Sequence, residues 1–137
     1  MAKRRVVVTG LGLVTSLGHD VPSTWSGIVA GKSGIDTLED FDTTDFSVKF
    51  AGVVKDFDPL AFLEKKDVKK MDGFIHYAIK GSIEAIDDSG LDFSDESLGN
   101  RTGVSIGSGI GGLTTIQDNA AQLALNGPRR ITPFFIP

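Results

Sequence analysis

The sequence contains no cysteine. This absence excludes a disulfide, a zinc site built on thiolates and a cysteine nucleophile anywhere within these 137 residues. Histidine, the side chain best suited to proton transfer near neutral pH, occurs only twice. His19 lies between Gly18 and Asp20 in an expected loop, and His76 lies beside the apolar stripe of an expected helix. Metal-ligand spacing is missing too, so we predict no catalytic and no metal-binding residue in this chain.

Long hydrophobic runs are also missing. No apolar segment approaches the ~20 residues that are needed to cross a membrane. The basic start, Met1–Arg5, is similar to the start of a secretory signal, but the apolar run behind it is only Val6–Val8 and ends at Thr9. We therefore expect a cytoplasmic protein with no membrane partner.

The composition is that of a globular protein, with 40% hydrophobic residues, 23% charged residues and a mean hydropathy of +0.04. The length fits one compact domain or part of a larger one. A net charge of −4 argues against a nucleic-acid partner. The charge is unevenly distributed, because Lys65, Lys66, Lys69 and Lys70 with Asp67 sum to +3 and leave −7 for the rest of the chain.

Short β-branched runs predict buried strands at Arg5–Gly10 and Gly103–Gly107. A further strand is expected at Lys49–Val54, inside an otherwise irregular stretch from residue 32 to residue 63. These strands are separated by segments with helical patterns. Strands alternating with helices indicate an α/β fold with a buried sheet.

Three segments have helical patterns. In the first, Ser23 or Thr24 is expected to cap a short helix that ends at Gly31. The clearest pattern runs over residues 67–88, where apolar residues recur every three or four positions and Gly90 provides the stop. The third covers residues 116–125 and is ended by Gly127.

The last seven residues, Ile131–Pro137, form an apolar stretch without a single charge. Such a stretch normally leads into more protein, because nothing in it favours exposure to water. We therefore expect this chain to be a fragment of a longer one.

The first glycine-containing turn has two interpretations. A strand followed by Gly10-x-Gly12 is how dinucleotide sites begin, and Asp36 lies where a ribose-binding acid could fall. The third glycine of that motif should stand at position 15, which is Thr15, and Pro22 delays the helix that would face a pyrophosphate. A tight structural turn is the favoured interpretation. A dinucleotide-binding oxidoreductase remains the alternative, which a titration with dinucleotide would test.

The second glycine loop, Gly107–Gly112, has four glycines in six residues but lacks the Gly-Lys-Ser/Thr that ends a phosphate-binding loop. Glycines allow positive φ or a close approach of the backbone to another group. One interpretation is a crowded buried turn. The other is a narrow wall of a binding site, from which Ile110 projects as the one large side chain. The residues alone leave both open.

Several motifs, in the same order and running essentially end to end, resemble those of one family. The chain is similar to the β-ketoacyl-acyl-carrier-protein synthases II of bacterial fatty-acid synthesis, condensing enzymes of the thiolase superfamily. The resemblance is carried by Arg4–Gly12, by Trp25 with Ala30–Ile35, by Lys70-Met71-Asp72 with Phe74-Ile75, by Ile106–Gly112, and by Gly127–Pro137.

The resemblance implies a thiolase-like, layered α/β/α fold built of two similar halves, of which residues 1–137 cover most of the first. It implies decarboxylative condensation of malonyl-acyl-carrier protein with acyl-carrier protein, in a homodimer that uses no metal or nucleotide cofactor. The cysteine nucleophile, two histidines and a lysine of the family all lie beyond residue 137. The fragment alone is therefore expected to be inactive. A non-catalytic partner subunit, like a polyketide chain-length factor, is the other alternative.

The resemblance also implies roles for residues that are present. Ile110 corresponds to a residue that lines the acyl pocket near the dimer interface, and Phe135 to one that the partner subunit contributes. The basic residues expected to dock the acidic carrier protein are Lys66, Lys69, Lys70, Arg129 and Arg130. The spacing of the three lysines places them on one face of the predicted helix, where complementary potentials would steer an acidic partner.

Overall fold

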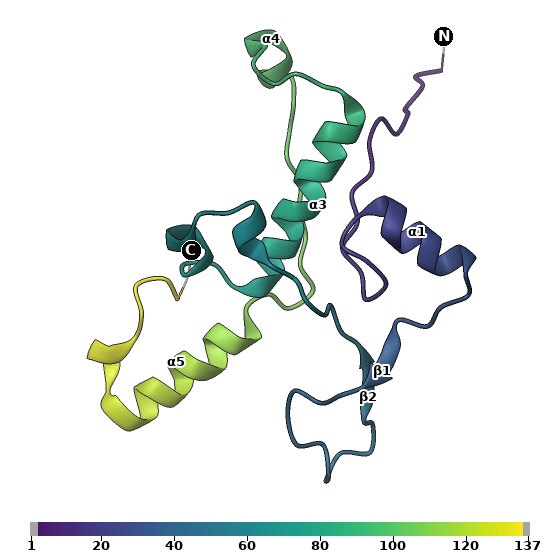
Figure 1. Ribbon diagram of the computed structural model, residues 1–137. Helices are drawn as coiled ribbons and strands as arrows, with labels where there is room; N and C mark the ends of the chain where they lie inside the picture. Colours follow the sequence, from purple (N-terminus) through teal and green to yellow (C-terminus); the bar gives the residue numbers. More distant parts are fainter. Residues whose placement is uncertain (1–2, 136–137) are drawn as a thin grey trace.

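The computed structural model describes residues 3–135. Its elements are α1 (Val21–Val29), β1 (Ile35–Thr37), β2 (Phe50–Gly52), η1 (Pro59–Ala61), α2 (Lys65–Val68), α3 (Gly73–Ser89), α4 (Glu96–Gly99), α5 (Leu113–Asn126) and η2 (Pro128–Arg130). Figure 1 shows α3 running through the middle of the molecule, with α1 and the β1–β2 pair to one side and α5 extending away on the other. Four residues lie outside the described ones: Met1 and Ala2, with which the basic start Met1–Arg5 begins, and Ile136 and Pro137, with which the motif Gly127–Pro137 ends.

The two buried strands predicted at residues 5–10 and 103–107 are wrong for this chain. Both segments are extended but unpaired, and Val6 and Val104 are 93% and 86% exposed. A strand forms only when its N–H and C=O groups pair with a neighbouring strand. The sheet within residues 3–135 contains only β1 and β2. The β-branched runs are thus suited to a sheet whose other strands this segment does not supply.

The strand predicted at residues 49–54 is confirmed in β2. It pairs antiparallel with β1, with Ile35 opposite Gly52 and Thr37 opposite Phe50. The sequence did not predict β1, because a three-residue exposed strand shows no hydrophobic alternation. This two-stranded hairpin lies outside the part of the molecule that positions the candidate site (Figure 1).

The long helix predicted over residues 67–88 is two helices, α2 and α3, separated by Lys69–Asp72. Asp72 has extended backbone and its Oδ1 accepts a hydrogen bond from the Gly73 N–H at 3.0 Å, so α3 begins there. The predicted stop is confirmed, since Gly90 has a left-handed φ of 64° directly after α3. The lysines therefore do not share a face of α3. They lie on α2 and in the turn that follows it.

The other two predicted helices exist, with one correction. α1 is capped by Asp20, whose Oδ1 accepts from the Ser23 N–H at 2.7 Å, and not by Ser23 or Thr24. The helix begins earlier than expected because proline is tolerated in a first turn, where its missing N–H has no partner to lose. α5 is confirmed over its predicted span, and Gly127 follows it. None of the helices within residues 3–135 is long and apolar enough to cross a membrane.

Carboxylates of α3 hold the N-terminal loop. Leu11 N–H donates to Asp88 Oδ2 at 2.9 Å. Leu13 N–H and Val21 N–H donate to the two oxygens of Glu84, at 3.0 Å and 2.7 Å. Figure 1 shows the extended N-terminal segment running alongside α3 for this reason. Leu11 and Leu13 lie outside regular structure, and Val21 is the first residue of α1, whose N–H has no partner within the helix. The carboxylates of α3 therefore supply the acceptors that these three N–H groups lack.

We expect Glu84→Ala, made in the whole enzyme that carries this segment, to lower the free energy of unfolding by about 2–3 kcal/mol, because two backbone N–H groups lose a charged acceptor. Thermal or denaturant unfolding measures the loss. The matched control is Asp87→Ala, an exposed carboxylate on the same helix that accepts no hydrogen bond from the residues described here. Equal loss in the two variants would mean that the loop is held by other contacts.

The chain has almost no interior of its own. Among residues 3–135 no hydrophobic side chain is buried; the buried polar residues are Thr24, His76 and Asn119. A compact monomer of 14.5 kDa exposes about 6,900 Å², whereas this chain exposes 11,010 Å². The excess surface, much of it on large apolar residues, is suited to contact with further protein.

Candidate functional site

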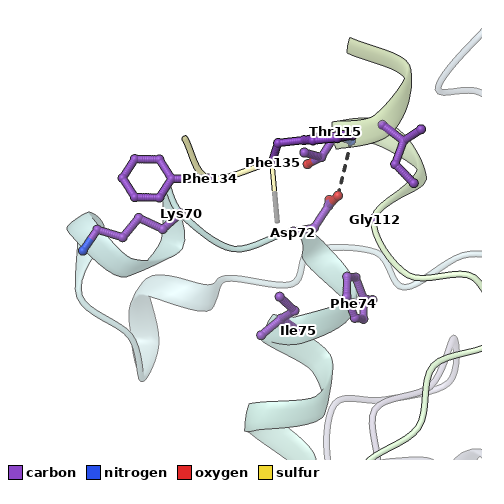
Figure 2. Close-up of a pocket in the computed structure, with 9 residues that line it drawn as sticks. Lys70, Asp72, Phe74, Ile75, Gly112, Thr115, Phe134 and Phe135 are labelled. Atoms are coloured by element: carbon purple, nitrogen blue, oxygen red, sulfur yellow. Dashed lines mark hydrogen bonds between the residues drawn. The ribbon is translucent and has the colours of Figure 1, made fainter. Parts of the chain in front are cut away.

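One carboxylate joins the N-termini of α3 and α5. Asp72 Oδ1 caps α3 at Gly73, while its Oδ2 accepts from the Thr115 N–H at 3.3 Å (Figure 2). α5 starts after Gly112, which has no side chain to cap it. Hydrogen bonding from Thr115, only partly opposed by burial, lowers the pKa of the Asp72 carboxyl below its usual value. The carboxylate therefore stays ionised through the neutral range and stabilises both positive helix ends.

A small cavity of about 110 Å³ lies beside this carboxylate. Figure 2 shows Phe74 and Ile75 reaching it from α3, and Phe134 and Phe135 from the C-terminal segment. The lining residues are Lys70, Asp72, Phe74, Ile75, Gly112, Thr115, Ile116, Phe134 and Phe135. The predicted pocket residue Phe135 and the predicted docking residue Lys70 therefore border the same cavity.

Asn119 holds the C-terminal segment onto α5. It is only 8% exposed, its Nδ2 donates to the Thr115 carbonyl at 2.8 Å, and its Oδ1 accepts from the Thr132 N–H at 3.0 Å. Thr132 in turn organises the tight turn that follows, since its Oγ1 and its carbonyl accept from the N–H groups of Phe134 and Phe135. The position of Phe135 is thus set through Asn119.

Ile110 is 72% exposed and does not line the cavity that contains Phe135. The structure does not bring the two predicted acyl-pocket residues together within this chain. A Cβ atom at Gly107 or Gly109 would have no atom of the chain within 4 Å, so the crowded-turn interpretation of the loop fails for these two glycines. Within this loop only Gly111 has a positive φ, 83°, which a residue with a side chain rarely adopts.

The predicted docking residues are all exposed. Lys66 forms an ion pair with Glu64 at 2.8 Å, and Lys70 forms one with Asp67 at 3.5 Å. Surface pairs of this kind contribute little to stability, so they leave both lysines available to a partner. Arg129 and Arg130 lie on η2, at the outer end of α5 and away from α2 (Figure 1). The basic residues therefore form two groups on separate elements.

The first glycine turn is explained by packing. A Cβ atom at Gly10 would overlap the Ala85 carbonyl, and one at Gly12 would overlap the Gly81 carbonyl, so both glycines allow the loop to lie directly on α3. The N-terminus of α1 is occupied by its own capping carboxylate. Both features agree with the structural interpretation of the turn and leave no place for a pyrophosphate at this helix end.

Both histidines lie where the sequence placed them. His19 is in the loop before α1 and its ring meets Phe57 edge-on, with ring centroids 5.3 Å apart. Phe57 also meets Tyr77 of α3 at 4.8 Å, so His19 belongs to an aromatic cluster. His76 is on α3 and is 8% exposed.

Sequence reasoning missed Asp72 and Asn119. For Asp72 a signal existed, because aspartate followed by glycine and an apolar helical run is typical of an N-cap. For Asn119 no signal existed, because its partner Thr132 is thirteen residues away and beyond the end of α5.

Comparison with known proteins identifies the family. Residues 3–137 match the family model for the β-ketoacyl synthase N-terminal domain. The whole chain is 51% identical, over 137 residues, to 3-oxoacyl-[acyl-carrier-protein] synthase 2 of Vibrio harveyi, and covers 33% of that protein. The chain therefore spans about a third of the length of the curated relatives it matches.

Solved structures share the fold. The ishigamide ketosynthase/chain length factor superimposes with a TM-score of 0.77 at 30% identity, over 98% of this chain and 33% of that one. A type II polyketide synthase acyl-carrier protein in complex with its ketosynthase gives a TM-score of 0.77 at 26% identity, over 96% of this chain and 34% of that one. The chain thus has the predicted thiolase-like fold, as part of a larger domain.

Proposed function

The chain belongs to the β-ketoacyl synthase family, to its N-terminal domain, and from that premise we propose that it is part of a 3-oxoacyl-[acyl-carrier-protein] synthase of fatty-acid synthesis. One observation carries the proposal: identity of 51% along all 137 residues with a protein of that name. A match of this extent includes the loops as well as the structural elements, and loops determine function more than the scaffold does.

The reaction proposed for the whole enzyme is a decarboxylative condensation. An acyl group passes from its carrier to the cysteine thiolate of the enzyme. Malonyl thioester then loses CO₂, and the resulting enolate attacks the acyl carbonyl and expels the thiolate. This chain has no cysteine, so the nucleophile is proposed to lie in the remaining two thirds of the enzyme. The two histidines and the lysine of the family are proposed to lie there as well, as the resemblance implies.

The role proposed for this segment is to shape the acyl pocket. Ile110 is the one large side chain of the glycine loop Gly107–Gly112. Because it is exposed in this chain, it can form a wall of the acyl pocket only when further protein covers it. Phe135 borders a cavity beside α3 and α5. In the proposed homodimer the pocket of one subunit is completed by Phe135 of the other, which accounts for the separation of the two residues within one chain.

The second proposed role is docking of acyl-carrier protein through Lys66, Lys69, Lys70, Arg129 and Arg130. The exposure of these side chains on an otherwise acidic chain supports it. So does the fold shared with a ketosynthase whose structure contains an acyl-carrier protein. The cytoplasmic location expected from the sequence stays a prediction of the same proposal.

Reversal of three lysine charges tests the docking role. In the whole enzyme, Lys66→Glu, Lys69→Glu and Lys70→Glu together should raise the KM for carrier-bound substrate about tenfold or more at low salt, because charges at an interface rim act jointly on encounter. Wild-type affinity should fall as ionic strength rises, while the variant's dependence flattens. Steady-state kinetics over a salt series measures both.

A short pantetheine thioester provides the substrate control, since it lacks the acidic protein. The variant should turn it over almost normally. The matched control variant reverses Lys3, Lys32 and Lys49, exposed lysines away from α2, with the same change in net charge. Loss of pantetheine turnover, or equal effects of the two triple variants, would contradict docking at Lys66, Lys69 and Lys70.

A non-catalytic partner subunit remains the second candidate, because the fold is shared with a ketosynthase/chain length factor. The two functions differ in one residue outside this chain, the cysteine nucleophile. Treatment of the whole protein with a cysteine-directed acylating inhibitor distinguishes them. A single labelled active-site cysteine supports the synthase, and a protein without one supports the partner subunit.

A further inference from the structure

We infer that Asp72 and Asn119 are positioning residues for the acyl-pocket wall, Asp72 acting on Ile110 and Asn119 acting on Phe135. The inference rests on the proposed function, because it concerns the same pocket. Both residues are inferred to act through the backbone groups that carry the wall, Asp72 through the start of α5 and Asn119 through the turn before Phe135.

Asp72 fixes the end of the glycine loop. Its Oδ2 accepts from the Thr115 N–H in the first turn of α5, forty-three residues along the chain. The carboxylate lies so close to Gly112 that a Cβ atom there would overlap it. The point where the loop joins α5 is therefore defined by a charged group that belongs to α3.

The rest of the loop has little else to hold it. A Cβ atom at Gly107 or Gly109 would meet nothing within 4 Å, and at Gly111 it would meet only the ring of Phe74, at 3.6 Å. Phe74 belongs to the same first turn of α3 that Asp72 caps. Within this chain the position of Ile110 consequently depends on the first turn of α3.

Asn119 provides the matching support for Phe135. Its two hydrogen bonds join the Thr115 carbonyl to the Thr132 N–H, and the side chain is almost fully buried. The Thr115 N–H therefore donates to Asp72, and the Thr115 carbonyl accepts from Asn119. A continuous polar chain runs from α3 through α5 to the turn that carries Phe135.

Removing the hydrogen bonds of Asp72 or of Asn119 should change which acyl chain lengths fit the pocket, and should leave the condensation step itself unchanged. A long primer contacts the wall along its terminal methylenes, whereas a short primer does not reach it. In the whole enzyme we expect Asp72→Ala to lower kcat/KM for long acyl primers about tenfold relative to short ones, the effect of losing a helix cap at this point. Asn119→Ala should act in the same direction.

The experiment compares kcat/KM for short and long acyl-carrier substrates in several variants. Asp72→Asn is the conservative variant, since its amide keeps a single acceptor oxygen and cannot cap both helices. Its loss of kcat/KM for long primers should be intermediate between wild type and Asp72→Ala. It also provides the test if Asp72→Ala fails to fold. Asp95→Ala is the matched control, because Asp95 caps the exposed α4 by accepting from Ser97 N–H at 2.9 Å, away from the pocket. It should leave the ratio of long to short primers unchanged.

A double-variant cycle shows whether Asp72 acts through Ile110. In an Ile110→Ala background the wall side chain is gone, so Asp72→Ala should no longer change the ratio of long to short primers. A ratio that still changes about tenfold in that background would overturn the inference. So would equal loss for all primer lengths in Asp72→Ala or Asp72→Asn. Wild-type enzyme that extends no primer at all would instead contradict the proposed function.

Discussion

Ile110→Phe in the whole enzyme should reduce kcat/KM for long acyl primers by roughly 50- to 100-fold and leave short primers nearly unaffected. The phenyl ring extends farther from the backbone than the isoleucine side chain and would displace the end of a long acyl chain. Loss of burial of about three substrate methylenes, each worth ~0.8 kcal/mol, corresponds to this factor. The effect should be large because the surrounding glycines offer no side chain that could move aside. Kinetics with a series of acyl-carrier substrates of increasing length measures it.

Ile110→Leu is the control for this substitution, since it conserves volume and normally costs little. Its length profile should stay close to that of wild type. If Ile110→Phe reduces turnover equally for every primer length, Ile110 is a packing residue and not a wall of the acyl pocket.

The second large effect is the absence of acyl transfer to the isolated 137-residue chain. Without a thiol the chain should acquire no covalent label from radiolabelled acyl-carrier protein and should not react with a cysteine-directed inhibitor. The whole enzyme, labelled under the same conditions, is the positive control. Mass spectrometry of the intact chain measures the label. A stable acyl adduct on the isolated chain would point to a serine or lysine nucleophile and would contradict the proposed division of the active site.

Helices with a strong local signal could be predicted from the sequence. α5 and the end of α3 at Gly90 follow from hydrophobic spacing and a glycine stop, which are properties of neighbouring residues. The break before α3 was missed because the hydrophobic pattern continues across it. The capping geometry of Asp72, and not the pattern, decides where the helix begins.

The two strands that were predicted but do not form have a different cause. The run Val6–Val8 and the segment around Val104 have the composition of buried strands, but pairing partners are not a local property. Extended backbone with 93% and 86% exposed valines is what remains when residues 3–135 supply no such partners. The composition predicts that both runs are strands of a larger sheet. Residues 3–135 do not form that sheet by themselves.

The candidate site could be predicted only in part. Ile110 and Phe135 were identified through the resemblance to a family, and their roles stay predictions here. Asn119 was not identified, because its partner Thr132 comes near it only through folding. The same holds for the bond from Thr115 to Asp72, although the capping role of Asp72 at Gly73 had a local signal. A side chain that forms a hydrogen bond with a backbone group far away in the sequence leaves no periodic pattern from which it could be predicted.

The most direct test of the proposed function measures both products of the condensation. The whole enzyme is incubated with an acyl-carrier protein and malonyl-carrier protein, and the product thioester and the released CO₂ are measured together. We expect a 3-oxoacyl thioester two carbons longer than the primer, with one CO₂ released for each product formed. Release of CO₂ without chain extension, or no reaction with either carrier by a folded enzyme that contains its cysteine, would contradict the assignment of this chain to a condensing enzyme.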